Sequence, residues 1–256
     1  MNLLETILEQ MSSDRYAQRQ FLVVVLTSLM CLRNKANFRN LSRYSDYHEK
    51  TYSRGFRRDF DFVKFNQLSL SQIRSSGHTL IAAVDCRFIN KSGKHTYGLD
   101  KFYNGSQGKA EKGLEISTLA VVDVTYNTAY NLSTRQTSAL TKPDETRVDQ
   151  YLAHLQQDRV ALPQCVRYLV ADGYYSKTKF INGVTALELG FIGKLRRDAN
   201  LRWLYKGEQK PRGRHKRYDS KVNFDNLGMK LKQLSHLIRI VRKGKISKIW
   251  YTIKNI

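Results

Sequence analysis

The sequence has few cysteines and no spacing that would organise them. Its 256 residues include three, Cys31, Cys86 and Cys165. An odd number without CxxC spacing argues against a disulfide framework and against a zinc site. We therefore expect a protein of a reducing cytoplasm.

Long hydrophobic runs are also lacking. The most apolar stretch, residues 21–32 (FLVVVLTSLMCL), is shorter than the roughly 20 residues that a membrane-spanning helix needs. It follows an acidic, polar start that includes Glu5, Glu9 and Asp14, which is unlike a secretory signal. We expect this stretch to be a buried helix and expect no membrane span.

Acidic residues are scarce relative to basic ones. The chain has 44 Lys and Arg against 22 Asp and Glu, a net charge of +22 with pI ≈ 10.0. Residues 1–75 contribute 12 − 7 = +5, residues 76–193 contribute 13 − 11 = +2, and residues 194–256 contribute 19 − 4 = +15. Such an imbalance indicates a polyanionic partner, with nucleic acid as the first choice and an anionic membrane as the weaker alternative.

The first third of the chain has a helical pattern. Residues 1–33 carry apolar side chains at helical spacing, with Ser12 and Ser13 as candidate caps before the apolar run. Within residues 37–56 a short helical pattern is followed by Ser45, a candidate N-cap, and by a second helix with Lys50, Arg54, Arg57 and Arg58. This resembles a helix-turn-helix, whose second helix can enter a DNA groove, but ordinary helix pairs have the same pattern.

From His78 onward the pattern changes to that of a mixed α/β domain. Apolar runs at residues 80–88, 114–126 and 167–171 predict strands, with a further extended piece at 128–135. The stripe of Val148, Tyr151, Leu152 and Leu155 predicts a helix over 144–157, and 176–189 predicts another, followed by a short strand, FIGKLR. This order indicates a mixed sheet with helices packed against it. Beyond Arg197 the sequence is basic and strand-like, with LIRIV and ISKIWYTI on either side of a Lys-Gly-Lys turn.

Two of these strands turn polar at an aspartate. Asp85 lies in TLIAAVDCRF and Asp172 in RYLVADGYYSK, and the carboxyl ends of strands in an α/β sheet are where ligand groups gather. Each Asp alone could simply cap a turn. Together they would repel unless a cation lay between them, and hard oxygen ligands favour Mg²⁺ or Mn²⁺. A carboxylate pair in so basic a chain is typical of enzymes that cut or join phosphodiesters.

The stretches around Asp85 and Asp172 show a family resemblance. The strings AVDCRFINKSGKHTYGLDKFYNGSQGKAEKGLEISTLAVVD and YLVADGYYSKTKFINGVTALELGFIGKLRRDANLRWLYKG are similar to those of DDE transposases of bacterial insertion sequences, in the branch with a β-strand insertion in the catalytic domain. The preceding NFRNLSRYSDYHEKTYSRGFRRDFDFVKFN resembles that group's N-terminal helical region. The resemblance implies an RNase H-like (retroviral-integrase-like) fold in which Asp85 and Asp172, 172 − 85 = 87 residues apart, are the first and second metal ligands.

The family's third ligand is a Glu within a Tyr-x2-Arg-x3-Glu-x6-Lys signature, and no such string occurs here. After Asp172 the only glutamates are Glu188, expected on the next helix and too close, and Glu208, in the basic KGEQKPRG turn. The chain stops at IWYTIKNI, so we expect an N-terminal portion of a transposase. With only two carboxylates, metal affinity and the in-line geometry should both suffer, since a metal site depends on ligand count.

Other polar residues have simpler interpretations. Asp123 is expected to be an outward-facing strand or turn residue, and His95 and His154 to be surface or satisfied histidines. The run KPRGRHKR is expected to contact phosphates, although a solvated face is the usual meaning of a charge run. Trp203, Tyr205, Trp250 and Tyr251 could stack on an unpaired base or pack within a hairpin.

The sequence thus predicts three regions: a helical, DNA-binding region (1–75), the first part of an RNase H-like catalytic core (76–197) and an incomplete, basic β-rich insertion (198–256). The predicted activity is Mg²⁺-dependent (or Mn²⁺-dependent) cleavage and transfer of double-stranded DNA at transposon ends and target DNA, in the bacterial cytoplasm and at the nucleoid. Two alternative functions remain open: a non-catalytic DNA-binding remnant that blocks the intact enzyme, and a structure-specific nuclease. Whether the chain forms a homodimer is also open. The expected DNA contacts are Arg54, Arg57, Arg58, Arg196, Arg197, Lys210, Arg212, Arg214, Lys216 and Arg217.

Overall fold

The computed structural model describes residues 3–11, 16–73, 77–93, 95–140, 143–194, 202–221, 238–242 and 245–249. The chain divides into two compact units, Met1–Ala139 with Ala153–Val166, and Leu140–Leu152 with Arg167–Ile256. The domain boundaries expected near residues 75 and 197 stay a prediction.

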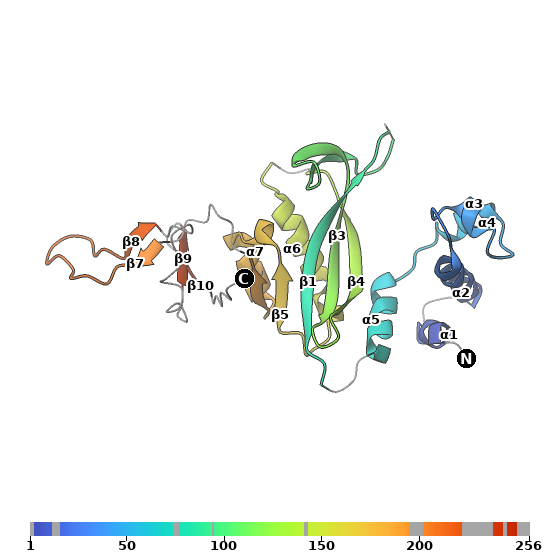
Figure 1. Cartoon of the computed structure of the whole chain (residues 1–256), viewed down its shortest axis with the longest axis horizontal. Coiled ribbons are helices and arrows are strands. Elements are labelled where there is room, and N and C mark those ends of the chain that lie inside the picture. Colours follow the sequence, from blue (N-terminus) through green and yellow to red (C-terminus); the bar gives the residue numbers. More distant parts are fainter. Residues whose placement is uncertain are drawn as a thin grey trace. The chain divides into compact units, whose positions relative to one another are not determined.

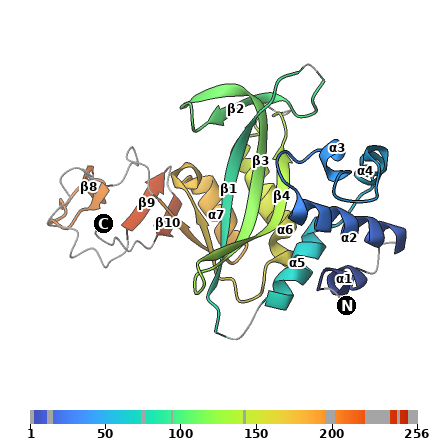
Figure 2. The same ribbon diagram turned by 45° about the vertical axis from the view of Figure 1, so that its right-hand side comes forward.

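The first unit begins with helices that share a hydrophobic core (Figure 2). They are α1 (Leu3–Glu9), α2 (Tyr16–Cys31), α3 (Phe38–Leu41), α4 (Glu49–Gly55) and α5 (Phe62–Ile73). At their centre Tyr52 is fully buried, and its hydroxyl lies 2.6 Å from Ser45 Oγ and 3.2 Å from Ser28 Oγ. Gly55 leaves room for the ring of Phe21, which a Cβ at that position would strike.

Helix α2 is only half buried, so the expectation of a buried helix is wrong for its last turns. Phe21, Leu22 and Val25 lie in the core, whereas Leu29 is 40% exposed and Met30 86% exposed. Within the described residues no helix is long and apolar enough to span a membrane.

The same unit contains an antiparallel sheet built around one long strand (Figure 1). The central strand β3 (Lys109–Asp123) pairs with β1 (Leu80–Asn90) from Leu80↔Asp123 to Asn90↔Gly113. Its other edge pairs with β4 (Thr128–Thr137), and its first residues pair with β2 (Asp100–Asn104). A β-bulge interrupts the β3–β4 ladder, because Leu119 pairs with Ser133 but Ala120 pairs with Asn131, which leaves Leu132 as the extra residue.

Alternation along β3 gives the sheet one well-buried face. Leu119 and Val121 point to this face, together with Val84 of β1, and all three are at most 4% exposed. The helix α6 (Arg147–Asp158) has its second half in this unit and is followed by the short helix η1 (Arg159–Ala161).

The second unit contains a parallel strand pair and two hairpins. β5 (Tyr168–Ala171) pairs in parallel with β6 (Gly190–Gly193), and the connection runs through η2 (Gly173–Tyr175) and α7 (Thr178–Ala186). Phe180 and Val184 on α7 are fully buried, which is the expected packing for a helix that crosses between parallel strands. Antiparallel pairs follow at β7 (Arg202–Leu204) with β8 (Tyr218–Lys221), and at β9 (Ile238–Arg242) with β10 (Lys245–Ile249).

Candidate active site and DNA-binding residues

Asp85 lies in the middle of β1 rather than at its end. The apolar run stops at Val84, but the strand continues to Asn90, so the strand turns polar at Asp85 without ending there. Asp85 is exposed and pairs across the ladder with Thr118. Its Oδ1 accepts a hydrogen bond of 2.8 Å from the backbone N–H of Cys86.

The sheet face that carries Asp85 is polar around it. Asp85, Thr118 and Thr134 follow one another across three neighbouring strands, and the two threonine hydroxyls lie 3.4 Å apart. Arg87 is two residues further along the same face and is exposed. The opposite face holds Val84 and Leu119, so the alternation of β1 separates the core from this polar row.

Asp172 follows β5 directly and starts a tight turn. It is exposed and is the N-cap of η2, where its Oδ1 accepts a hydrogen bond of 2.9 Å from the backbone N–H of Tyr174. Among the described residues, no further hydrogen bond or ion pair reaches the carboxylate of Asp85 or that of Asp172. One oxygen of each carboxylate is therefore held by a local N–H, and the other is available for a ligand.

Aromatic packing fixes the turn after Asp172. The rings of Tyr174 and Tyr175 make an edge contact at 5.6 Å, and Tyr151 contacts both rings. Tyr175 is buried, while Tyr174 is 41% exposed and carries the Lys177 ammonium 4.0 Å above its ring. Tyr174 and Lys177 were not predicted as site residues. The available signal was the pair of tyrosines that begins two residues after Asp172, with a lysine shortly after the pair.

Asp85 belongs to the first unit and Asp172 to the second, so their approach to one another stays a prediction. Among the described residues there is no group of three or more His, Cys, Asp or Glu that could hold a metal ion. Glu188 is exposed in the turn after α7, with a positive φ of 59°, rather than on the helix as expected. Glu208 is exposed in the loop between β7 and β8.

Asp123 is buried, so the prediction of an outward-facing residue is wrong. It ends β3, where its Oδ1 accepts hydrogen bonds from the backbone N–H groups of Thr125 (2.9 Å) and Tyr126 (3.2 Å). Its Oδ2 lies 2.6 Å from Nδ1 of His78, beside a cavity of about 280 Å³ that is also lined by Tyr130. These bonds compensate the burial of the carboxylate and secure the turn between β3 and β4.

His154 is buried and fully bonded, which is one of the two interpretations predicted for it. Its Nδ1 lies 2.9 Å from Ser117 Oγ, and its Nε2 lies 2.8 Å from Ser133 Oγ and 3.2 Å from Asp158 Oδ2. Asp158 in turn accepts two hydrogen bonds from Arg135, of 2.9 and 2.5 Å. Burial, more than any neighbouring charge, lowers the pKa of His154, and the Arg135 guanidinium holds the pKa of Asp158 below its usual range. This network joins α6 to β3 and β4.

His95, the second histidine considered as a site residue, is exposed.

The arginines of the helical region that were predicted to contact DNA are exposed. Arg54 lies in the last turn of α4, and Arg57 and Arg58 follow the helix in a turn. The N-cap of α4 is His48, whose Nδ1 accepts from the N–H of Lys50 at 3.3 Å, so the prediction of a Ser45 cap is wrong. Ser45 is instead bonded to the hydroxyl of Tyr52.

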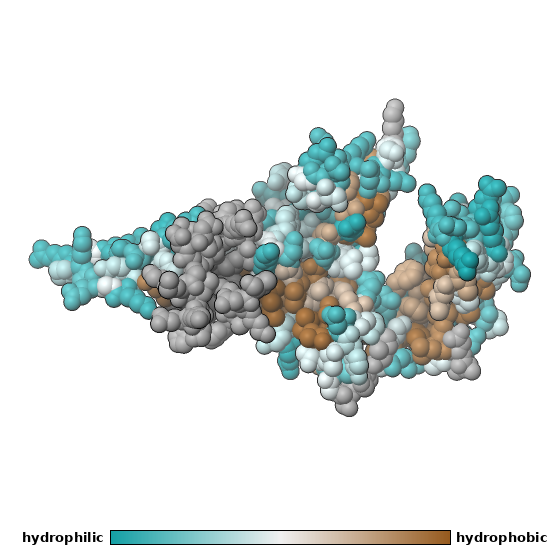
Figure 3. Space-filling model, viewed as in Figure 1, coloured by the Kyte–Doolittle hydropathy of each residue, from teal (hydrophilic) through white to brown (hydrophobic). Residues whose placement is uncertain are grey.

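The second group of predicted DNA contacts lies on the β7–β8 hairpin, whose surface is hydrophilic (Figure 3). Lys210, Arg212, Arg214, Lys216 and Arg217 are all exposed there. Trp203 and Tyr205 are half-buried, and the Lys216 ammonium lies 4.5 Å from the centre of the Tyr205 ring. Arg196, Arg197, Trp250 and Tyr251 lie outside the described residues.

Comparison with known proteins agrees with the fold. The model of the family described as DDE superfamily endonuclease matches residues 8–236. No curated protein matched the sequence. The mixed α/β fold is confirmed, since helices and both antiparallel and parallel strand pairs are present as in an RNase H-like nuclease. Enzymes of this superfamily generally use divalent metal ions, and their substrate is DNA. Over most of its length, therefore, this chain belongs to the DDE superfamily of endonucleases.

Proposed function

We propose that the protein is the transposase of a DNA insertion sequence, which binds transposon ends and catalyses Mg²⁺-dependent strand cleavage and transfer. The observation that carries the proposal is the shared environment of Asp85 and Asp172. Each is an exposed carboxylate where an apolar strand turns polar, with Oδ1 held by a nearby N–H and with no hydrogen bond or ion pair from the described residues to Oδ2. Family membership supports DNA as the substrate.

Asp85 and Asp172 would hold the metal, and their chemistry suits it. Carboxylate oxygens are the ligands that Mg²⁺ and Mn²⁺ prefer. Bound metal would activate a water or a 3′ hydroxyl and stabilise the leaving oxygen in an in-line displacement. The chain's own residues keep the two carboxylates in place, because an N–H bond restricts each side chain and the packed tyrosines restrict the turn after Asp172.

DNA would be held by the exposed cations. Arg54, Arg57 and Arg58 offer one positively charged surface, and the hairpin loop offers another. Arg196 and Arg197 belong to the same proposal by sequence alone. Such contacts would release counterions, so binding should weaken steeply with salt. We also propose a bacterial cytoplasmic location at the nucleoid and a homodimer that brings two DNA ends together.

One observation favours a second candidate, a DNA-binding protein that does not cut. The described residues provide two candidate ligands but no group of three, and metal affinity depends on ligand count. Such a protein would still occupy transposon ends and would compete with an active transposase for them.

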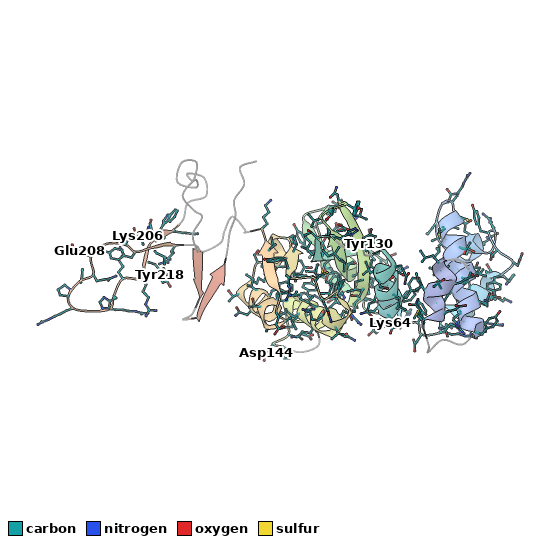
Figure 4. All side chains as sticks on the ribbon, turned by 90° about the horizontal axis from the view of Figure 1, so that it is seen from below. Lys64, Tyr130, Asp144, Lys206, Glu208 and Tyr218 are labelled. Atoms are coloured by element: carbon teal, nitrogen blue, oxygen red, sulfur yellow. The ribbon has the colours of Figure 1, made fainter. Side chains whose placement is uncertain are left out.

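A nicking assay distinguishes the two. Purified protein is incubated with supercoiled plasmid carrying transposon ends, with Mg²⁺, Mn²⁺ or EDTA, and nicked circles are counted. We expect metal-dependent nicking that Asp85→Asn and Asp172→Asn each reduce by at least about 100-fold. Asp144→Asn, at an exposed turn position (Figure 4), is the matched control and should cut normally. DNA that is bound but never cut would refute the catalytic proposal and leave the second candidate.

A further inference from the structure

The loop of the β7–β8 hairpin, residues 205–217, concentrates positive charge on a small structure. It contains six basic residues, Lys206, Lys210, Arg212, Arg214, Lys216 and Arg217, and one acidic residue, Glu208, which gives 6 − 1 = +5. All seven are exposed, and side chains spread outward from the loop (Figure 4). The Lys216 ammonium also lies 3.3 Å from Asp219 Oδ1, and the remaining charge faces outward and is available to a polyanion.

Hydrogen bonds hold the base of this loop closed. The N–H of Tyr205 donates to the carbonyl of Arg217 at 3.1 Å. The side-chain amide of Gln209 adds a further pair of hydrogen bonds across the loop. It donates to the carbonyl of Lys216 and accepts from the N–H of Lys216, both at 2.8 Å. The hydroxyl of Tyr205 also donates to the carbonyl of Glu208 at 3.0 Å. Residues 210–215, which we call the tip, thus protrude from a closed ribbon.

The tip has the sequence Lys-Pro-Arg-Gly-Arg-His, with Gly213 between two arginines. Gly213 has a φ of +97°, a conformation that other residues rarely adopt, and within the described residues no atom lies within 4 Å of where a Cβ would be. The main chain at Gly213 can therefore come close to another surface with Arg212 and Arg214 on either side. Pro211 has no N–H and restricts the backbone before them.

These features suit the minor groove of DNA better than the phosphates alone. That groove is about 6 Å wide, and its narrow A·T-rich form has an enhanced negative potential that attracts inserted arginines. Phosphate contacts would be served as well by lysine and would not require a glycine between arginines. Gln209, the side chain of the loop suited to reading adenine in the major groove, already has its amide engaged by Lys216.

We propose that the tip is a minor-groove reader that selects A·T-rich duplex DNA, with Arg212 and Arg214 as its specificity-determining residues. The inference rests on the proposed function, because it assumes that DNA is the ligand of this chain. It adds a base preference to contacts that were expected to be sequence-independent.

Binding of the full chain to three duplexes of equal length tests the proposal in EDTA, where no strand is cut. One duplex is A·T-rich, one is G·C-rich, and the third has the G·C sequence with inosine in place of guanine. An I·C pair keeps the hydrogen-bonding groups of G·C in the major groove but lacks the amino group in the minor groove. We expect the A·T and I·C duplexes to bind about equally, and each about tenfold more tightly than the G·C duplex.

Variants separate base preference from charge. Arg212→Lys with Arg214→Lys keeps the net charge, so it should retain the salt dependence of binding and lose the tenfold preference. Arg202→Lys, on β7 outside the tip, is the matched control and should retain the preference. The proposal is overturned if I·C binds like G·C, if the three duplexes bind alike, or if the double variant still discriminates. Failure of the nicking assay would refute cleavage without affecting this preference, whereas absence of all duplex binding would refute both.

Discussion

The buried network around His154 allows a sharp prediction about stability. Replacing His154 by Leu removes both ring nitrogens while keeping an apolar side chain in the space. The hydroxyl of Ser117 then loses its partner inside the protein, whereas Ser133 keeps its hydrogen bond to Asp158, which also retains its bonds to Arg135. A buried polar group left without a partner costs about 1–3 kcal/mol, so the Ser117 hydroxyl should lower the unfolding free energy by about that amount.

Removing the stranded Ser117 hydroxyl should restore much of that loss. The double variant with His154→Leu and Ser117→Ala is predicted to be more stable than His154→Leu alone, because replacing both partners of a hydrogen bond by apolar groups is nearly neutral. Urea unfolding followed by circular dichroism measures both differences. If the double variant is less stable than the single one, hydrogen-bond satisfaction does not explain the network and the reasoning is refuted.

The same network predicts how stability depends on pH. Burial lowers the pKa of His154 in the folded protein, so the unfolded chain binds the proton first as the pH falls. Stability should therefore decrease as the pH drops through the unfolded value of about 6.5, by at most about 1.4 kcal/mol per pH unit, and level off below the folded pKa. The double variant lacks this histidine and should lose this part of the pH dependence. Equal slopes between pH 7 and 5 in both proteins would contradict a buried, neutral His154.

Three further outcomes are expected. Tyr52→Phe should lower the unfolding free energy by about 1–2 kcal/mol in urea denaturation, because it removes a hydroxyl with two buried or half-buried partners, and an unchanged midpoint would show that those bonds are unimportant. Gly55→Ala should cost about 1–3 kcal/mol in the same assay because its Cβ strikes the ring of Phe21, and a variant as stable as wild type would show that the ring can move. Lys179→Gln should raise the pKa of Asp149 above its value of about 2, since the ammonium is the largest cause of the lowering, and an NMR titration that finds no rise would exclude that cause.

Local patterns were sufficient where a segment's own residues determine its structure. The apolar stripe of Val148, Tyr151, Leu152 and Leu155 predicted α6, and all four side chains are buried. The apolar run at residues 80–88 predicted β1, which extends from Leu80 to Asn90.

Features that depend on distant partners were missed. β2 has no apolar alternation of its own and exists by pairing with the first residues of β3. Asp123 is buried because His78, 123 − 78 = 45 residues earlier, lies next to it. Ser45 was predicted to be a helix cap but bonds with Tyr52, a contact that depends on how α4 packs. No local pattern contains such information, and the relative placement of Asp85 and Asp172 is of the same kind.

The bulge between β3 and β4 changes the phase of side-chain alternation along β4. Before it, Tyr130 points toward the buried face, and after it Ser133 and Arg135 do, so the parity of inward-pointing residues switches within one strand. The extra residue, Leu132, is itself fully buried. One inserted residue thus allows a single strand to contribute a buried leucine to the core and, directly after it, the polar side chains of Ser133 and Arg135, which bond to α6. Deleting Leu132 should therefore remove the bulge without turning either half of β4 over, because Asn131 would then precede Ser133 and the alternation from Tyr130 to Arg135 would be regular. The strand would lose only the buried side chain that the extra residue contributes.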